Sequence, residues 1–339
     1  MRITTRMLER PLVTPFTIAR GTQTMARNVL VELEHDGRTG TGVAAPSAFY
    51  GESPEHVVAT TERLAECIGD DPFAIEQVFE RMNRSIRFNP AAKAALNMAM
   101  WDLAGKICGQ PVYKMLGLSG LPLPKTSFTI GIDEPDVMAE RAAEASRNFP
   151  ILKIKLGHAN DIEIVKAVRR STDAVIRVDA NAAWTPKQAV RIMNEIAPLG
   201  VELLEQPVPP ADLAGLRFIR ERVPVPVIAD ESAVTYEDVP GLCGVVDGIN
   251  IKLMKCGGIS GALRMIRAAR ACGLKVMLGC MVESSVGITA AAHIAGLVDW
   301  ADLDGHLLIS GDPFTGVRIR NGDLVLPDGP GLGLGLFQG

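Results

Sequence analysis

The sequence predicts an α/β fold in which a parallel β/α barrel is joined to a smaller α+β domain. The chain has 339 residues, which is more than one ordinary domain of about 150 residues needs. Eight short apolar runs recur every 22 to 26 residues in its second part, with helical segments between them. Such regular spacing favours a closed barrel over an open doubly wound sheet, which usually carries a glycine-rich first turn that is missing here.

The first third of the chain predicts the α+β domain. Segments 28–34 and 39–45 alternate between polar and apolar residues and are joined by an Asp-Gly turn, which is typical of a β-hairpin. Asn89 and Pro90 begin a long apolar segment with a helical period, and we expect Asn89 to be its N-cap. We therefore expect an α+β capping domain over residues 1–120.

The repeats place the barrel over residues 125–305. We expect its strands at 127–130, 152–156, 175–178, 203–205, 225–228, 249–253, 276–278 and 301–303. We expect the intervening helices at 136–147, 161–170, 186–196, 213–222 and 261–271. After the barrel, 317–320 and 323–326 flank an Asn-Gly dipeptide, which predicts a second hairpin. We expect this tail, 306–339, to return to the first domain and complete it.

Composition excludes several classes of function. The net charge is −4 without a strongly basic run, which argues against nucleic acid as a partner, and no apolar stretch of 18 residues predicts a membrane span. The first residues contain no apolar signal segment, and the six cysteines never form a C-x-x-C pair. We therefore expect buried, reduced thiols in a cytoplasmic protein.

Carboxylates end three consecutive predicted strands. Asp179, Glu205 and Asp230 should lie at equal depth on adjacent strands, so that their side chains converge. Three unpartnered carboxylates in a partly dry pocket repel one another unless a divalent cation neutralises them. Ligands that are all oxygen favour Mg²⁺, with Mn²⁺ as the other possibility. The alternative is a ring of salt bridges with Lys155, Lys252 and neighbouring arginines.

Lysines flank the three acids in strand order. Lys153 and Lys155 point to the same face of one strand, and two such close ammonium groups should lower the pKa of at least one of them. Lys252 lies four strands away on the opposite wall. A single buried lysine is usually an ion-pair partner, but two that flank a metal site indicate proton transfer on both faces of one carbon.

Two more aspartates, Asp302 and Asp304, end the eighth predicted strand. Two carboxylates on one face there could receive a cation such as a free ammonium group. The alternative is that they cap a loop.

These elements together resemble the enolase superfamily, and within it the muconate-lactonizing subgroup. The matching residues are Lys153-x-Lys155, Asp179-x-Asn181, Glu205-Gln206-Pro207, Asp230-Glu231-Ser232 and Lys252. The resemblance implies a modified TIM-type (β/α)7β barrel with a capping domain. It also implies metal ligation by the three acids, an enediolate intermediate, Lys155 and Lys252 as the acid/base pair, and Lys153 as the residue that tunes Lys155.

The Asp302-x-Asp304 pair is similar to that of the dipeptide epimerases. Residues 14–21 resemble the mobile capping loop of the L-Ala-D/L-Glu epimerases, with Arg20 facing an acidic side chain of the substrate. The expected reaction is epimerisation of the second residue of an L,L-dipeptide in murein peptide salvage, by a homo-oligomer. An o-succinylbenzoate synthase, a muconate-type cycloisomerase and a non-catalytic metal-binding protein remain alternatives, and Glu283 has no role that the sequence predicts.

Overall fold

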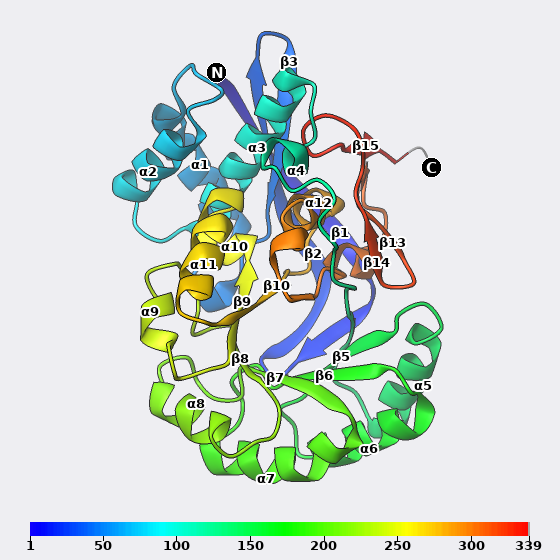
Figure 1. The fold of residues 1–339 in the computed structure, drawn as a ribbon. Helices are drawn as coiled ribbons and strands as arrows, with labels where there is room; N and C mark the ends of the chain where they lie inside the picture. Colours follow the sequence, from blue (N-terminus) through cyan, green and yellow to red (C-terminus); the bar gives the residue numbers. More distant parts are fainter. Residues whose placement is uncertain (338–339) are drawn as a thin grey trace.

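The computed structural model describes residues 1–337 and divides into a cap and a barrel (Figure 1). The cap contains an antiparallel sheet in the order β1-β2-β3, with its bounds at β1 (Arg2–Ile18), β2 (Gly21–His35) and β3 (Arg38–Ala44). Its helices are η1 (Ala48–Tyr50), α1 (Pro54–Ile68), α2 (Ile75–Ser85), α3 (Pro90–Cys108) and α4 (Val112–Met115). The predicted hairpin is confirmed as β2 and β3.

Strand β1 is absent from the sequence prediction. It pairs with β2 along nearly its whole length, with an irregularity between Pro11 and Phe16. Residues 14–21, expected to be a capping loop, are instead the end of β1, a two-residue turn and the first residue of β2. Prolines argue against a central strand, but β1 is at the edge of its sheet, and its outer side pairs through an isolated bridge between Leu12 and Ile309. The hairpin therefore brings Arg20 down to the barrel as part of a regular element.

Helix α3 packs against the sheet and begins at the predicted Pro90. Asn89 is the N-cap residue, as predicted, but its φ is 54° and its side chain makes no capping hydrogen bond. The carboxylate of the buried Glu52 instead accepts the N–H of Ala91 at 3.0 Å. The helix approaches β3 so closely that a Cβ on Gly42 would lie 1.9 Å from a carbonyl oxygen of α3.

Eight parallel strands form the barrel, in the order of the chain. They are β4 (Phe128–Ile130), β5 (Ile151–Lys155), β6 (Val175–Asp179), β7 (Val201–Glu205), β8 (Val227–Ala229), β9 (Gly248–Lys252), β10 (Lys275–Gly279) and β11 (Trp300–Ala301). A parallel bridge between Thr126 and Ala301, with the N–H of Ser127 donating to the Ala301 carbonyl at 3.2 Å, joins the first edge to the last. The predicted barrel is confirmed, and the open doubly wound sheet is excluded because sheet neighbours are chain neighbours.

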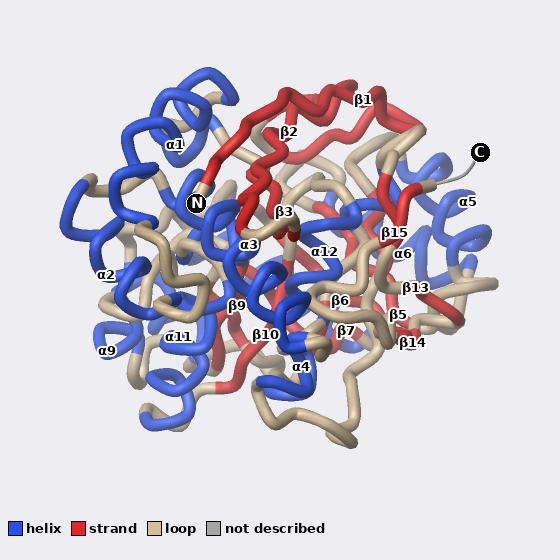
Figure 2. The backbone as a smooth tube through the Cα atoms, turned by 90° about the horizontal axis from the view of Figure 1, so that it is seen from above, coloured by secondary structure: helices blue, strands red, loops and turns tan. Residues whose placement is uncertain are grey.

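Helices cover the outside of the barrel strands, as α5, α9 and α11 do in Figure 2. They are α5 (Pro135–Ala145), α6 (Asp161–Ser171), α7 (Pro186–Ile196), α8 (Leu213–Arg220), α9 (Val239–Leu242), α10 (Leu253–Cys256), α11 (Ile259–Ala271) and α12 (Ser285–Ala292). The last strand is followed only by the short η4 (Gly305–Leu308). Seven β/α units and a final strand make the (β/α)7β arrangement.

The barrel interior is layered. Leu203, Ile228, Met277 and Trp300 form a small buried apolar cluster. Each lies two residues before a position at the C-terminal end of its strand, and therefore on the same inward face but one layer lower. This apolar layer closes the barrel beneath the charged residues and leaves only its C-terminal mouth open to a ligand.

The tail contributes β12 (Phe314–Thr315), β13 (Arg318–Arg320), β14 (Asp323–Val325) and β15 (Gly335–Leu336). The predicted hairpin is confirmed as β13 and β14. The Gly322 carbonyl accepts the N–H of Thr126, just before the first barrel strand, at 2.9 Å. Other tail residues contact the cap, as when the Leu332 N–H donates to the buried Asp102 at 2.7 Å. The last residues of the predicted tail, 338–339, lie outside the described residues.

The cysteines and helices test two expectations from composition. All six thiols are free, but only Cys67 and Cys256 are buried, while Cys108 and Cys243 are exposed. The expectation that all six are buried is therefore wrong. Within residues 1–337, no helix has both the length and the apolar character needed to cross a membrane.

Candidate active site

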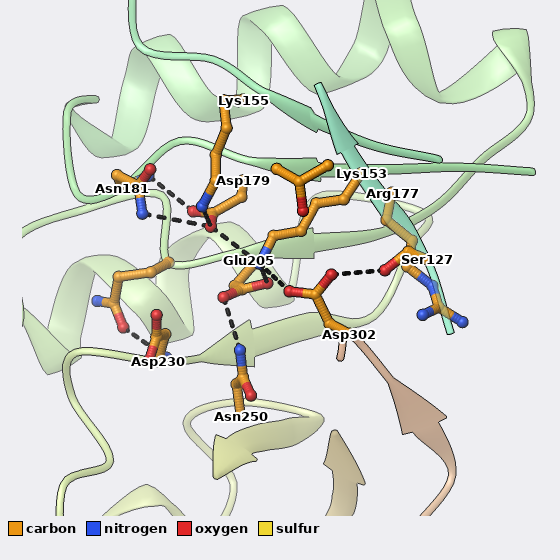
Figure 3. Close-up of polar contacts among 12 residues, drawn as sticks. Ser127, Lys153, Lys155, Arg177, Asp179, Asn181, Glu205, Asp230, Asn250 and Asp302 are labelled. Atoms are coloured by element: carbon orange, nitrogen blue, oxygen red, sulfur yellow. Dashed lines mark hydrogen bonds and ion pairs between the residues drawn. The ribbon is translucent and has the colours of Figure 1, made fainter. Parts of the chain in front are cut away.

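The charged residues expected at the strand ends gather at the C-terminal mouth of the barrel (Figure 3). Lys155 of β5, Asp179 of β6 and Glu205 of β7 are direct register partners across their strands. Asp230 follows β8 and lies two residues beyond Ile228, the register partner of Glu205. Between Glu205 and Asp230 the register therefore steps by two residues, as it does where barrel strands tilt.

Lys153 is at the centre of the acids. Its Nζ lies 2.8 Å from Glu205, 2.8 Å from Asp302 and 3.2 Å from Asp179. Burial opposes its charge, but the carboxylates of Asp302, Glu205 and Asp179 outweigh burial and raise its pKa well above the usual range. The lower pKa expected for at least one of the two lysines is therefore not found at Lys153, because carboxylates from three other strand ends surround its ammonium group.

The other two predicted lysines come from opposite walls and are also ion-paired. Lys155 Nζ lies 2.7 Å from Asp179 Oδ2, and Lys252 Nζ lies 2.7 Å from Asp230 Oδ2. Burial by itself would lower the pKa of Lys252, but the Asp230 carboxylate raises it by more, so the pKa lies above its usual value. The salt bridges foreseen as the alternative to a metal site are therefore present in this structure.

The three acids differ in their electrostatic balance. Burial would raise the pKa of Asp179 and of Asp230, but lysine charges next to each of them hold it below the usual range. Glu205 is also held by the Asn250 amide, which donates to its Oε1 at 2.8 Å. Burial and the nearby Asp179 nevertheless raise the pKa of Glu205 to about 7. The lysines therefore do not fully neutralise this group of acids.

The donor set fits a hard divalent cation. The three acids offer only carboxylate oxygens, and the buried Asn181 Oδ1 and Glu231 Oε2 nearby have no hydrogen-bond partner. No group of three acidic, histidine or cysteine side chains within residues 1–337 is yet arranged as a metal cage. Lysine nitrogens lie between the carboxylates, so a cation would have to displace these ion pairs.

Two further residues hold Asp230 in place: Lys255, which the sequence analysis missed, and Gln206, which matched the family motif without a role of its own. The buried Lys255 binds Asp230 Oδ1 and also donates to the carbonyls of Ala233 and Asn250, each at 2.9 Å. Gln206 accepts the Asp230 N–H at 2.9 Å. The signal for Lys255 was its position three residues after Lys252, because one helical turn returns a side chain to the same side.

A cavity of about 670 Å³ lies between the barrel mouth and the cap, within the usual range for small-molecule sites. Six of the predicted site residues line it: Arg20, Lys153, Lys155, Lys252, Asp302 and Asp304. The cap supplies apolar lining from β1, β2 and the segment around η1. The cavity therefore has a charged barrel floor and a roof in which apolar residues lie among polar ones such as Gln23, Arg27 and Glu52.

Asp302 and Asp304 lie in the cavity, but beyond the strand predicted to carry them, since β11 ends at Ala301. Asp302 binds Lys153 and accepts the Ser127 hydroxyl at 2.6 Å. Asp304 accepts the Thr129 N–H at 2.6 Å. Burial and the neighbouring Asp302 raise the pKa of Asp304 to about 7. The two aspartates thus hold the backbone after β11 in place and also face the cavity.

Two further acids, Glu231 and Glu283, lie near the mouth of the barrel. Arg20 Nη1 lies 2.7 Å from Glu231 Oε1 and donates to the Asn181 carbonyl at 2.9 Å. The predicted substrate-facing arginine is therefore paired with an acid of the protein. Glu283 is buried and accepts the Met281 N–H at 2.9 Å, and burial raises its pKa to about 7.

Two family models match the chain. The mandelate racemase / muconate lactonizing enzyme N-terminal domain matches residues 2–117, and the enolase C-terminal domain-like model matches residues 137–337. A curated L-Ala-D/L-Glu epimerase of Bacteroides thetaiotaomicron is 41% identical over 98% of this chain and 88% of its own length. A hydrophobic dipeptide epimerase of Enterococcus faecalis is also 41% identical, over 95% of this chain and 94% of its own length.

A solved structure agrees. The crystal structure of a dipeptide epimerase from Enterococcus faecalis, complexed with Mg and L-Leu-L-Tyr, superposes with a TM-score of 0.94. It is 40% identical and covers 98% of both chains. The chain belongs to the mandelate racemase / muconate lactonizing enzyme family of the enolase superfamily.

Proposed function

We propose that this chain is a dipeptide epimerase, which moves a proton at the α-carbon of the second residue, from L-Ala-L-Glu to L-Ala-D-Glu and back. One observation carries the proposal: Lys155 and Lys252 reach one cavity from opposite walls, next to a group of acids. Full-length relatives named as epimerases support it. A proton can then leave from one face of a carbon and return to the other.

We propose that Asp179, Glu205 and Asp230 hold Mg²⁺, with Mn²⁺ as a substitute. The oxygen-only donor set and the raised pKa of Glu205 support this, because a cation stabilises the ionised form of that carboxyl. The metal-bound state of a structural relative supports it as well. A bound divalent cation would neutralise the substrate carboxylate and the enediolate, and would offset the carboxylate charge that now faces the lysines.

The lysines divide the proton transfer between them. On one face a neutral lysine amine takes the α-proton, and on the other face an ammonium group returns one, so the total of bound protons is unchanged. Lys155 and Lys252 exchange these parts when the direction of reaction is reversed. Lys153, two residues before Lys155 on the same face of β5, is proposed to tune Lys155 through its positive charge.

Asp302 and Asp304 are proposed to bind the free ammonium group of the dipeptide. Both line the cavity, and a cation there would favour the ionised form of Asp304. Two aspartates would repel one end of a dicarboxylate, which disfavours the o-succinylbenzoate and muconate alternatives. Arg20 is proposed to form an ion pair with an acidic side chain of the second residue.

The setting of the enzyme is a set of further proposals. Residues 1–120 with 306–339 act as the cap that selects the substrate, while 125–305 carry the chemistry. Free thiols support a reducing, cytoplasmic location. A homo-oligomer and murein peptide recycling are proposed on the resemblance alone.

The test is solvent exchange. The protein is incubated with Mg²⁺ and L-Ala-L-Glu in D₂O, and NMR follows the α-proton of the second residue. Deuterium should enter at that carbon as the D-epimer forms. Epimer that retains its original proton would contradict the two-base mechanism, and a faster reaction with a dicarboxylate substrate would favour the cycloisomerase alternative.

A further inference from the structure

The charge of Arg20 is already balanced before any substrate binds. Its guanidinium lies 2.7 Å from Glu231 Oε1, and only about a third of its side chain is exposed. The two residues come from different parts of the molecule, since Arg20 is in the β1–β2 turn and Glu231 follows the strand-end Asp230. The cap therefore closes on the barrel through an ion pair at the place where a substrate side chain would lie.

Glu231 depends on this partner. The residue is 3% exposed, and its other oxygen, Oε2, is buried without a hydrogen-bond partner. Arg20 is its one ion-pair partner within residues 1–337. Removing Arg20 would leave this buried carboxylate without an ion-pair partner, so it could attract another cation.

An aromatic ring lies against the guanidinium of Arg20. The guanidinium carbon lies 4.4 Å from the centroid of the Phe49 ring. Phe16, Ile18 and Met25 of the hairpin line the same cavity, together with the polar Thr22 and Gln23. A substrate side chain there meets apolar and uncharged polar groups and a cation whose charge is compensated.

We propose that Glu231 sets the charge preference for the second residue of the substrate through its ion pair with Arg20. The inference rests on the proposed function and deepens it. Because Glu231 competes for the guanidinium, the cavity accepts uncharged second residues alongside acidic ones. Glu231 is a specificity-determining residue although it does not itself line the cavity.

The experiment compares substrates that differ only in charge. For each variant, kcat/KM is measured by deuterium uptake with L-Ala-L-Glu, its neutral isostere L-Ala-L-Gln, and L-Ala-L-Lys. Ratios between substrates cancel any loss that a variant causes in folding, cap closure or metal binding. Glu195→Gln, in an exposed ion pair with Lys166 at 3.7 Å, is the matched control for Glu231→Gln and should leave all ratios unchanged.

In the wild type, the preference for Glu over Gln should be below about tenfold. Glu231→Gln frees Arg20 and should raise that preference by about tenfold or more, the factor expected for one hydrogen bond to a charged group. Arg20→Met uncovers Glu231 and should reverse the preference, while raising Lys relative to Gln. In the double variant both trends should disappear.

An unchanged Glu/Gln ratio in Glu231→Gln would overturn the proposal. If that variant is inactive, the Lys/Gln ratio of Arg20→Met decides, and an unchanged ratio there overturns it. Absence of deuterium uptake from every dipeptide in the wild type would instead contradict the proposed function itself. The two failures are therefore distinguishable.

Discussion

Replacement of Lys255 by methionine tests the support of the candidate metal site. The side chain is fully buried and its Nζ binds Asp230 Oδ1 together with the carbonyls of Asp230, Ala233 and Asn250. Methionine keeps the length but removes every one of these hydrogen bonds. Breaking one partner of a buried ion pair costs about 3–5 kcal/mol, and we expect the lower end because Lys252 still neutralises Asp230.

The size of the effect in a melting experiment follows from the chain length. For 339 residues at ~2.1 cal/mol/K per residue, about 3 kcal/mol corresponds to a fall in Tm of roughly 4 °C. Saturating Mg²⁺ should recover more Tm in Lys255→Met than in the wild type, because a cation replaces the lost charge at Asp230.

Differential scanning fluorimetry with and without Mg²⁺ measures both effects. Lys166→Met, at a half-exposed lysine in a surface ion pair, is the control and should change Tm by less than about 1 °C. A Lys255→Met variant that melts like this control would refute the reasoning. The expected fall in Tm, if Mg²⁺ did not reduce it, would also refute the reasoning, because the lysine would then stabilise only the backbone carbonyls.

Three other expectations follow from the site. Lys252→Ala should slow epimerisation by about 10²–10⁴-fold, while exchange of the α-proton with solvent continues in one epimer of the substrate. Lys155→Ala should retain this exchange in the opposite epimer. Equal loss of exchange from both epimers in both variants would contradict the action of the two lysines on separate faces. Asp304→Asn should raise Tm more at pH 8 than at pH 5. The pKa of Asp304 is raised to about 7, so between about pH 4 and 7 this acid binds more protons in the folded than in the unfolded state, and its destabilising effect grows as the pH rises. An equal gain in Tm at both pH values would refute this. EDTA should abolish activity, and Glu205→Gln should remove the increase in Tm that Mg²⁺ gives the wild type; a retained increase would place the metal elsewhere.

The barrel could be predicted because its signals are local. Each β/α unit carries its own apolar run and helical period, so the spacing survives without knowledge of the neighbours. Helix α7, predicted at 186–196, occurs at those residues because Thr185 and Gln188 form a capping box at its start. Strand β1 was missed because its prolines argue against a central strand, and only its place at the sheet edge makes them acceptable.

The candidate site divides in the same way. The C-terminal ends of parallel strands meet at one mouth, so the sequence alone determined that Lys155, Asp179, Glu205 and Lys252 would gather there. It could not give the two-residue register step between Glu205 and Asp230, because register depends on how the strands pair.

Partners were decided by the tertiary structure alone. Lys153 is surrounded by acids from three other strand ends, which overrides the effect of Lys155 two residues away. Arg20 meets Glu231, 211 positions later in the chain, because a hairpin of the cap crosses the barrel mouth. Residue type and the spacing of apolar residues are local properties that can be read from the sequence directly. Ion-pair geometry and pKa depend on distances across the fold, since electrostatic energy falls with separation and rises with burial.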